Sequence, residues 1–193
     1  MKREAVLRTA ASMFCERGYT ATQMDDVARQ LGVTKPTIYY YFKNKEDVLV
    51  ACFEVGFEQI ESTVRDVSHA KDGAERLRRV LEAYAKIMMQ DFGKCTVRIP
   101  TADMSEESRK RIAIQRRKFD DKIRSLVKDA IADGSIPECD PKIATFAILG
   151  SLNWIGQWHR PDGPMATTEI AAAVVGQLFR GLEQRPGLDS DLM

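Results

Sequence analysis

Apolar residues recur along this chain at intervals of three and four positions, whereas alternation of apolar and polar residues is nearly absent. This spacing predicts amphipathic helices rather than strands, because an α-helix completes one turn about every 3.6 residues. Glycine and proline divide the pattern into separate segments. We therefore expect an all-α protein, with helices at approximately these residues: 2–17, 22–31, 34–42, 44–68, 73–92, 105–133, 141–158 and 167–182.

Four of the predicted helices begin at residues that commonly cap helix N-termini. Thr22, with Asp25 three positions later, resembles a capping box, so the second helix is expected to begin there. Thr34, Asn44 and Thr167 are expected to cap later helices, because their side-chain oxygens accept hydrogen bonds from free backbone N–H groups.

Residues 23–42 have the layout of a helix-turn-helix unit, with a helix, a glycine-containing turn and a short second helix. Gly32 supplies the turn, and Ala28 is small enough for the two helices to cross closely. The short helix begins with Thr34, Lys35 and Thr37, whose hydroxyl and ammonium groups suit base edges and phosphates. The pattern therefore predicts that the start of this helix meets DNA.

Aromatic and basic side chains follow on the same short helix. The hydroxyl groups of Tyr39, Tyr40 and Tyr41 are able to reach phosphates, and Lys43 and Lys45 add positive charge nearby. One of the three tyrosines is expected to lie in the core, because three consecutive helix positions cannot all face one way. The start of the next helix also presents backbone N–H groups that suit a phosphate.

Two stretches resemble the signature of the TetR family of regulators. The first reads LGVTKPTIYYYFKNKEDVL over residues 31–49, and the second is the spacing of Phe14, Gly18, Tyr19 and Thr22 before it. Together they cover about the first 50 residues. Beyond them the chain is similar to the family in its helical architecture and its length.

This resemblance implies a three-helix DNA-binding domain over residues 1–47 and an effector-binding and dimerisation domain over residues 48–193. It also implies a homodimer that binds a double-stranded DNA operator and is released by a small ligand. The residues that the resemblance places at or near DNA are Thr22, Gln23, Thr34, Lys35, Pro36, Thr37, Tyr39, Tyr41 and Lys45.

The last two predicted helices differ from the others. Residues 141–158 are apolar on nearly every side, and residues 167–182 have a similar composition. A helix that is apolar all round must be buried all round, which a small domain cannot easily achieve alone. A partner subunit is therefore expected to cover the outer side, with Ile148 and Val175 as candidate contacts. The alternative is a helix enclosed within one subunit.

The family resemblance also implies an internal ligand pocket in the second domain. Arg116 is the most informative candidate, because it lies at helical spacing from Phe119 and Ile123 on an apolar stripe. A cation there needs a partner, which is either Asp120 one turn later or the anionic group of a ligand. The candidate effector-binding residues, each also compatible with an ordinary core position, are Tyr84, Met88, Phe92, Arg116, Phe119, Ile123, Asn153, Trp154 and Trp158.

The segment LNWIGQWHRPDGP, residues 152–164, is similar to a TetR subgroup that controls fatty-acid or steroid-ring degradation and responds to acyl-CoA thioesters. The resemblance implies a small apolar effector such as an acyl-CoA or a fatty acid. The basic residues between Arg109 and Lys118 either meet CoA phosphates or form a solvated helix face. A sensor of amphipathic drugs and a DNA-binding protein without a ligand stay open as alternatives.

Composition limits the other possibilities. The formal net charge of the 193 residues is +1, so any positive charge that meets DNA must be local. Residues 1–52 carry eight Lys/Arg against six Asp/Glu, and the remainder carries 21 against 22. This small asymmetry agrees with DNA binding by the N-terminal part.

Other chemistries find little support in the sequence. The sequence contains two histidines and no nucleophile elbow, phosphate-binding loop or metal-ligand spacing. We therefore expect no enzyme, metal site or cofactor. Cysteines 15, 52, 95 and 139 are widely spaced, which favours reduced thiols, with a redox sensor as the alternative. No apolar run reaches the roughly 18 residues of a membrane span and no signal peptide is visible, so we expect no membrane partner and a cytoplasmic protein.

Overall fold

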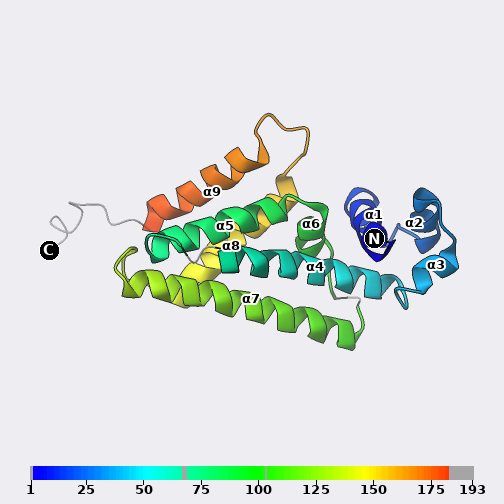
Figure 1. The fold of residues 1–193 in the computed structure, drawn as a ribbon, viewed down its shortest axis with the longest axis horizontal. Helices are drawn as coiled ribbons and strands as arrows, with labels where there is room; N and C mark the ends of the chain where they lie inside the picture. Colours follow the sequence, from blue (N-terminus) through cyan, green and yellow to red (C-terminus); the bar gives the residue numbers. More distant parts are fainter. Residues whose placement is uncertain (1, 67–68, 103, 183–193) are drawn as a thin grey trace.

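The computed structural model describes residues 2–66, 69–102 and 104–182, and these residues form helices and connecting turns without a strand (Figure 1). The prediction of an all-α protein is therefore confirmed. The helices are α1 (Lys2–Arg17), α2 (Met24–Leu31), α3 (Lys35–Tyr39), α4 (Lys45–Asp66), α5 (Gly73–Met88), α6 (Asp91–Arg98), α7 (Glu106–Ala132), α8 (Pro141–Trp158) and α9 (Thr167–Leu182).

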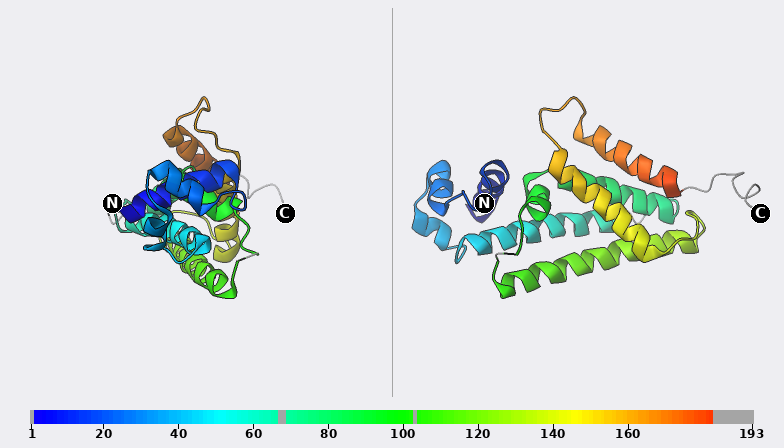
Figure 2. Two further views of the ribbon diagram at one scale, coloured as in Figure 1. Left: turned by 90° about the vertical axis from the view of Figure 1, so that its right-hand side faces the viewer. Right: turned by 180° about the vertical axis from the view of Figure 1, so that it is seen from behind.

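The molecule has a small head, formed by α1, α2 and α3, at one end of a bundle of longer helices (Figures 1 and 2). Helix α4 leaves the head and runs into the bundle beside α7, while α9 lies against α5. The short helix α6 sits where the head and the bundle meet, because it packs against α1, α4 and α8.

The head and the bundle each have a hydrophobic core. The head core joins apolar residues of α1, α2 and α3 to residues 48–53 of α4, and α6 completes it with Phe92, Cys95 and Ile99. The bundle core is formed mainly by α5, α7, α8 and α9. The predicted domain boundary after residue 47 thus falls within the first turn of α4, whose N-terminal half belongs to the head core.

Residues 73–92 were expected to form one helix, and this prediction is wrong. Helix α5 ends at Met88, and the chain turns through Met89 and Gln90 before α6 begins. The turn brings the backbone of Gly93 against the carbonyl group of Ile87, so closely that a Cβ atom would overlap its oxygen. The apolar spacing continues across this turn, which is why periodicity alone did not reveal it.

The predicted capping box at Thr22 is also wrong. Helix α2 begins at Met24, and Thr22 is fully buried before it. The Thr22 hydroxyl donates instead to the carbonyl oxygens of Gly18, at 2.8 Å, and Met13, at 3.2 Å. Thr22 therefore closes the turn between α1 and α2 from inside the head.

The other predicted caps have mixed outcomes. Asn44 caps α4 as expected, because its Oδ1 accepts a hydrogen bond from the Asp47 N–H at 2.7 Å. Thr34 precedes α3, but its hydroxyl lies 2.9 Å from that of Thr37 and makes no capping bond. Thr167 is the first residue of α9 rather than the residue before it.

The outer side of α8 is apolar and uncovered in a single chain. Ile143 is 63% exposed and Trp154 is 64% exposed, and Phe146 lies between them on the same side. Enclosure of α8 within one subunit is therefore excluded. Ile148 and Val175 were expected to face outward, and this is wrong, because both are buried in their own bundle. No helix in the described part of the chain is long and apolar enough to cross a membrane.

The close approach at Gly93 generates a stability prediction. Gly93→Ala should lower the free energy of unfolding by about 1–3 kcal/mol, the usual cost of overpacking, because the new methyl group overlaps the Ile87 carbonyl. Gly176→Ala is a matched control within α9, where an added Cβ meets no atom within 4 Å. It should be neutral or stabilising by up to about 1 kcal/mol. Urea denaturation followed by circular dichroism measures both, and equal stabilities would contradict the packing described.

Candidate functional site

Helices α2 and α3 and the turn between them form the expected helix-turn-helix unit. Gly32 has a φ of +63°, a left-handed conformation that suits glycine, and its N–H donates to the Arg29 carbonyl at 3.1 Å. Val27 of α2 and Ile38 of α3 are fully buried and anchor the unit on the head core. The opposite side of α3 consequently faces solvent.

Most of the residues predicted to meet DNA lie on this solvent-facing side. Tyr40, which the family resemblance did not place at DNA, is 83% exposed and lies edge-on to Tyr41. None of the three tyrosines is fully buried, but Tyr41 is partly buried and packs against the head core, so the expectation that one of them is core is met in part. The predicted residues with exposed side chains are Gln23, Thr34, Lys35, Pro36 and Tyr39, and those with partly exposed side chains are Thr37, Tyr41 and Lys45.

Two predicted DNA contacts are engaged within the head itself. Thr22 is withdrawn as a side-chain contact, because its hydroxyl is fully buried and bonded to backbone carbonyls. The Lys45 ammonium lies 4.3 Å from the centre of the Tyr19 ring and donates to the Thr20 carbonyl at 3.3 Å. Partial burial there lowers the pKa of Lys45. The hydrogen bond to Thr20 uses one of the three ammonium donors, so Lys45 keeps two for a phosphate.

Lys35 is held by an ion pair in the free protein. Its Nζ lies 2.9 Å from a carboxylate oxygen of Asp25 on α2, and this hydrogen bond raises the pKa of Lys35. Both side chains are about half exposed, so the pair is screened by water and worth little in stability. A DNA phosphate can therefore replace Asp25 as the partner of Lys35 at small cost.

The bundle contains a partly open cavity of about 540 Å³ bounded by α4, α5, α6, α7 and α8. Its walls combine aromatic and aliphatic side chains with a nearly equal share of polar surface, and apolar walls with placed polar groups are found in small-molecule sites. The lining residues are Gly56, Phe57, Tyr84, Met88, Thr96, Val97, Arg116, Phe119, Asp120, Phe146, Leu149, Gly150, Asn153, Trp154 and Gln157.

The polar groups of the cavity form two small sets. The Tyr84 hydroxyl donates to Oδ1 of Asn153, and burial, with the negative charge of Asp120, raises the pKa of Tyr84. Tyr84 thus stays neutral and keeps its proton for hydrogen bonding. Partial burial also raises the pKa of Asp120, although the nearby cations Arg124 and Arg116 oppose this shift.

One of the two sequence interpretations expected Arg116 to pair with Asp120. The structure shows no direct ion pair between these two side chains. The Nη2 of Arg116 donates to the Thr96 carbonyl of α6 at 3.0 Å, and its guanidinium lies 5.7 Å from the centre of the Phe53 ring. Arg116 lines the cavity and is exposed. Its single backbone hydrogen bond leaves donors that an anionic ligand could use.

Six of the nine predicted effector residues meet at this cavity, namely Tyr84, Met88, Arg116, Phe119, Asn153 and Trp154. Phe92, Ile123 and Trp158 do not line it. Phe92 belongs to the head core because the chain turns before α6, and Ile123 is fully buried in the bundle core. Trp158 is 46% exposed at the end of α8.

The nine predicted effector residues include none of the cavity walls supplied by α4 and α6. Phe57 lies 6.2 Å from Phe119, measured between ring centres, across the cavity wall. Thr96 and Val97 enter through α6, whose existence was not predicted. Phe146 and Gln157 were passed over among the apolar residues of α8, where no local signal separates cavity-facing from outward positions.

Helix α6 is fastened to the end of α8 beside the cavity. Arg98 donates to the carbonyl oxygens of Gly156, at 2.6 Å, and Gln157, at 3.2 Å. The Gln157 side chain returns a hydrogen bond to the Val97 carbonyl at 2.8 Å. The cavity wall and the head core are therefore joined through one short helix.

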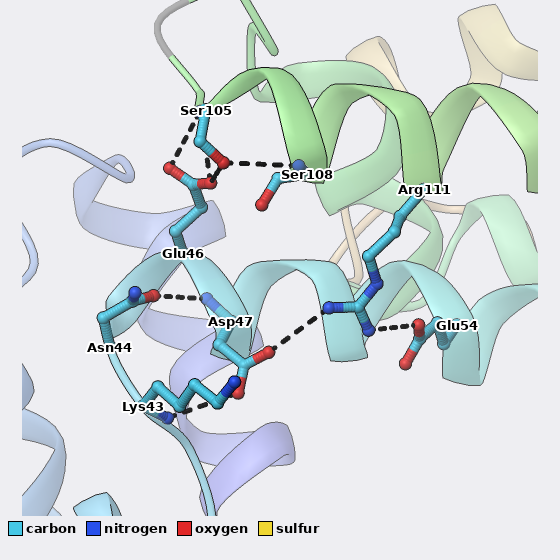
Figure 3. A network of polar contacts seen from close by, with 8 residues as sticks. All are labelled: Lys43, Asn44, Glu46, Asp47, Glu54, Ser105, Ser108 and Arg111. Carbon is cyan, nitrogen blue, oxygen red and sulfur yellow. Dashed lines mark hydrogen bonds and ion pairs between the residues drawn. The ribbon is translucent and has the colours of Figure 1, made fainter.

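A second connection joins the first turn of α4 to the start of α7 (Figure 3). The Glu46 carboxylate accepts hydrogen bonds from the backbone N–H and hydroxyl of Ser105, which caps α7, and these bonds lower the pKa of Glu46. Arg111 of α7 lies between Asp47, at 3.6 Å, and Glu54, at 2.7 Å, both on α4. These contacts tie the helix that leaves the head to the bundle.

The geometry defines a helix-turn-helix DNA-binding protein with a separate ligand-sized cavity. Residues 6–52 match the family model described as bacterial regulatory proteins, tetR family. Residues 70–182 match the model described as tetracyclin repressor-like, C-terminal domain. The chain therefore belongs to the TetR family of transcriptional regulators, and the family predicted from its sequence is confirmed.

Known members of the family cover nearly the whole chain. The crystal structure of PfmR, a TetR family transcriptional regulator from Thermus thermophilus, superposes with a TM-score of 0.82 at 31% identity, over 93% of this chain and 99% of that one. AibR, crystallised with isovaleryl coenzyme A and operator DNA, gives 0.80 at 29% identity, over 93% and 98%. The fatty acid metabolism regulator protein of Bacillus subtilis (strain 168) is 25% identical over 184 residues, or 93% of this chain and 95% of its own length.

The exposed side of α3 generates a prediction about DNA binding. Lys35→Ala should weaken binding to duplex DNA and lower the salt slope by about one, because one phosphate contact is lost. Tyr40→Ala should also weaken binding. Lys128→Ala, an exposed lysine on α7, is the matched control and should bind like the parent. Fluorescence anisotropy at several salt concentrations measures all three, and equal binding by every variant would show that α3 is not the reading helix.

Proposed function

We propose that the protein is a dimeric repressor that leaves its operator when a small apolar acid, such as an acyl-CoA, enters the cavity. The observation that carries the proposal is the position of α6. Thr96 and Val97 of this helix line the cavity, while Cys95 and Ile99 lie in the head core. A ligand that displaces α6 would therefore turn the head and its reading helix.

The make-up of the cavity favours a ligand with an apolar chain and an anionic end. Phe57, Phe119 and Leu149 offer apolar surface to the chain. Arg116 has guanidinium donors for a carboxylate or phosphate, and the volume falls within the roughly 300–1,000 Å³ range of small-molecule sites. That AibR was crystallised with both isovaleryl coenzyme A and operator DNA supports the same ligand class here.

A second copy of the chain would complete the cavity wall. Phe146, Gly150 and Trp154 line the cavity and also lie on the exposed apolar side of α8. In the proposed dimer, α8 and α9 of two subunits pack together and cover this side. Such packing would set two reading helices about 34–36 Å apart, the distance between successive major grooves.

The energy needed for release is modest. A tenfold loss of operator affinity requires the ligand to favour the released conformation by about 1.4 kcal/mol, and a hundredfold loss requires about twice that. A charge-assisted hydrogen bond contributes about 1.5–3 kcal/mol. If a remaining Arg116 donor bound a ligand anion in the released conformation only, with the Thr96 hydrogen bond kept, that one bond would suffice for a tenfold loss.

A second candidate function is the sensing of cationic amphipathic compounds. The observation that favours it is the Asp120 carboxylate, which lies in the cavity wall beside the aromatic rings of Phe119 and Tyr84. Aromatic faces and a carboxylate together suit a ligand cation. The raised pKa of Asp120 means that such a ligand would bind more weakly as pH falls through that pKa, since the carboxylate is then protonated.

The exposed side of α8 generates a prediction about oligomeric state. Ile143→Glu should convert the dimer to a monomer, because it places a charge in the proposed interface. Ile114→Glu is the matched control, since Ile114 is a similarly exposed isoleucine on α7, outside the proposed interface. Sedimentation velocity at micromolar concentration distinguishes the two. A parent protein that is already monomeric would refute the dimer.

The cavity generates a prediction about ligand response. Acyl-CoAs of increasing chain length should release the protein from labelled operator DNA at progressively lower concentration, because each methylene contributes about 0.8 kcal/mol when buried. Arg116→Ala should weaken the response about tenfold, as expected for a lost charge-assisted hydrogen bond. Arg117→Ala is the control, since Arg117 is next to Arg116 on α7 but does not line the cavity. Release by a cationic dye and by no thioester would favour the second candidate function.

A further inference from the structure

Two cysteines far apart in the sequence meet where the head packs on the bundle. The Sγ of Cys15, in the last turn of α1, lies 3.6 Å from the Sγ of Cys95 on α6. Cys95 is fully buried, and Cys15 is partly exposed. The proposed function makes no use of either thiol.

A second cavity gives access to Cys15. It has a volume of about 340 Å³ and lies between the end of α1 and the segment that follows α6. Cys15 lines it together with Arg98, and the rest of the wall is formed mainly by Tyr19, Ile99 and Met104. A small molecule in this cavity would meet the sulfur of Cys15 beside a cation, while Cys95 stays covered.

The surroundings divide two roles between the thiols. A hydrogen bond from the Cys95 thiol lowers the pKa of Cys15, and the positive charges of Arg98 and Lys94 act in the same direction. Burial and the Asp91 carboxylate oppose this shift without cancelling it. The same hydrogen bond, together with burial, raises the pKa of Cys95. Cys15 is thus the thiol that ionises first, and the thiolate is the form that reacts.

We propose that Cys15 and Cys95 form an oxidation site for small hydroperoxides, at which a disulfide fastens the head to the bundle. The Cys15 thiolate attacks the nearer peroxide oxygen, the O–O bond breaks, and the products are a sulfenic acid and an alkoxide, or hydroxide from hydrogen peroxide. Cys95 then attacks the Cys15 sulfur, and its proton leaves with the hydroxyl group as water. The two sulfur atoms give up two electrons in total, which reduce the peroxide.

The geometry suits the second step, because a disulfide of about 2.05 Å needs the sulfur atoms to approach by only about 1.5 Å. The other cysteines lack these features. Cys52 is fully buried, and burial raises the pKa of its thiol. Cys139 precedes α8, and within the described residues its sulfur contacts no other cysteine.

The disulfide would act on the contact between α6 and the head, on which the proposed function depends. Cys15 belongs to a helix of the head, and Cys95 is one residue from the Thr96 that lines the ligand cavity. A covalent bond between them would hold α6 against α1 whatever occupies the cavity. The oxidised protein would therefore stay on its operator when the effector is added, a consequence that rests on the proposed function.

The chemical part of the proposal is tested without DNA or effector. Full-length protein is treated with hydrogen peroxide, alkylated, digested and mapped by mass spectrometry. The expected product is a peptide pair joined through Cys15 and Cys95 within one chain. Cys95→Ala should instead leave a sulfenic acid on Cys15 that dimedone traps, and Cys139→Ser should form the disulfide like the parent. Oxidation that begins at Cys139, or a disulfide between chains, would overturn the proposal.

Alkylation rates provide an independent measure of the assigned roles. At near-neutral pH, iodoacetamide should modify Cys15 more slowly in Cys95→Ala than in the parent, because the variant lacks the hydrogen bond that lowers the Cys15 pKa. The two rates should converge at alkaline pH, where Cys15 is ionised in both proteins. Equal rates at neutral pH would refute the activation of Cys15 by Cys95.

The locking consequence is tested last on the oxidised parent. Its thermal unfolding temperature should rise above that of the reduced protein, since the new bond closes a long loop, and Cys95→Ala should show no such rise. Effector should no longer release the oxidised parent from operator DNA, and reduction should restore release. If the disulfide forms and effector still releases the oxidised protein from DNA, the proposed effect of the disulfide on release is refuted. The proposed function is not affected by that result.

Discussion

The placement of α6 is the constraint on which the rest of this structure depends. The chain must turn sharply after Met88 to bring α6 between the head and the bundle, and only a residue without a side chain fits at Gly93. Once there, α6 fills three roles on different sides. It completes the head core, supplies a wall of the ligand cavity, and binds the end of α8 through Arg98.

The energies of these contacts explain how α6 can move without separating from the head. Burial of a large apolar side chain contributes about 1.5–3 kcal/mol, so Phe92 and Ile99 together hold α6 to the head more strongly than a hundredfold change in DNA affinity requires. The polar contacts of Arg116 and Gln157 with the α6 backbone lie at the cavity, where a ligand can compete for their donors. A bound ligand would therefore rearrange the polar contacts first, while the apolar ones carry the movement to the head.

Much of this arrangement could be predicted from the sequence, and its failures have physical causes. The helix-turn-helix and most helix ends follow from local signals such as Gly32 and Asn44, whose effects depend on neighbouring backbone. The break before α6 depends on a contact with Ile87 that exists only in the folded chain, and the assignment of Phe92 to the ligand cavity failed with it. The proximity of Cys15 and Cys95, 80 positions apart, is likewise a property of packing alone. Which sides of α8 are covered could not be read from a helix that is apolar on nearly all of them.

The apolar character of α8 has one more consequence, which is optical. The chain contains two tryptophans, and both Trp154 and Trp158 lie on this helix, one in the wall of the ligand cavity and one at the helix end. Both are substantially exposed in the single chain. The intrinsic ultraviolet emission of the whole protein therefore originates almost entirely from a single helix. Any event that changes the hydration of that helix will alter the spectrum of the unlabelled protein, so the molecule carries its own chromophore at the place where a ligand and a second subunit would meet.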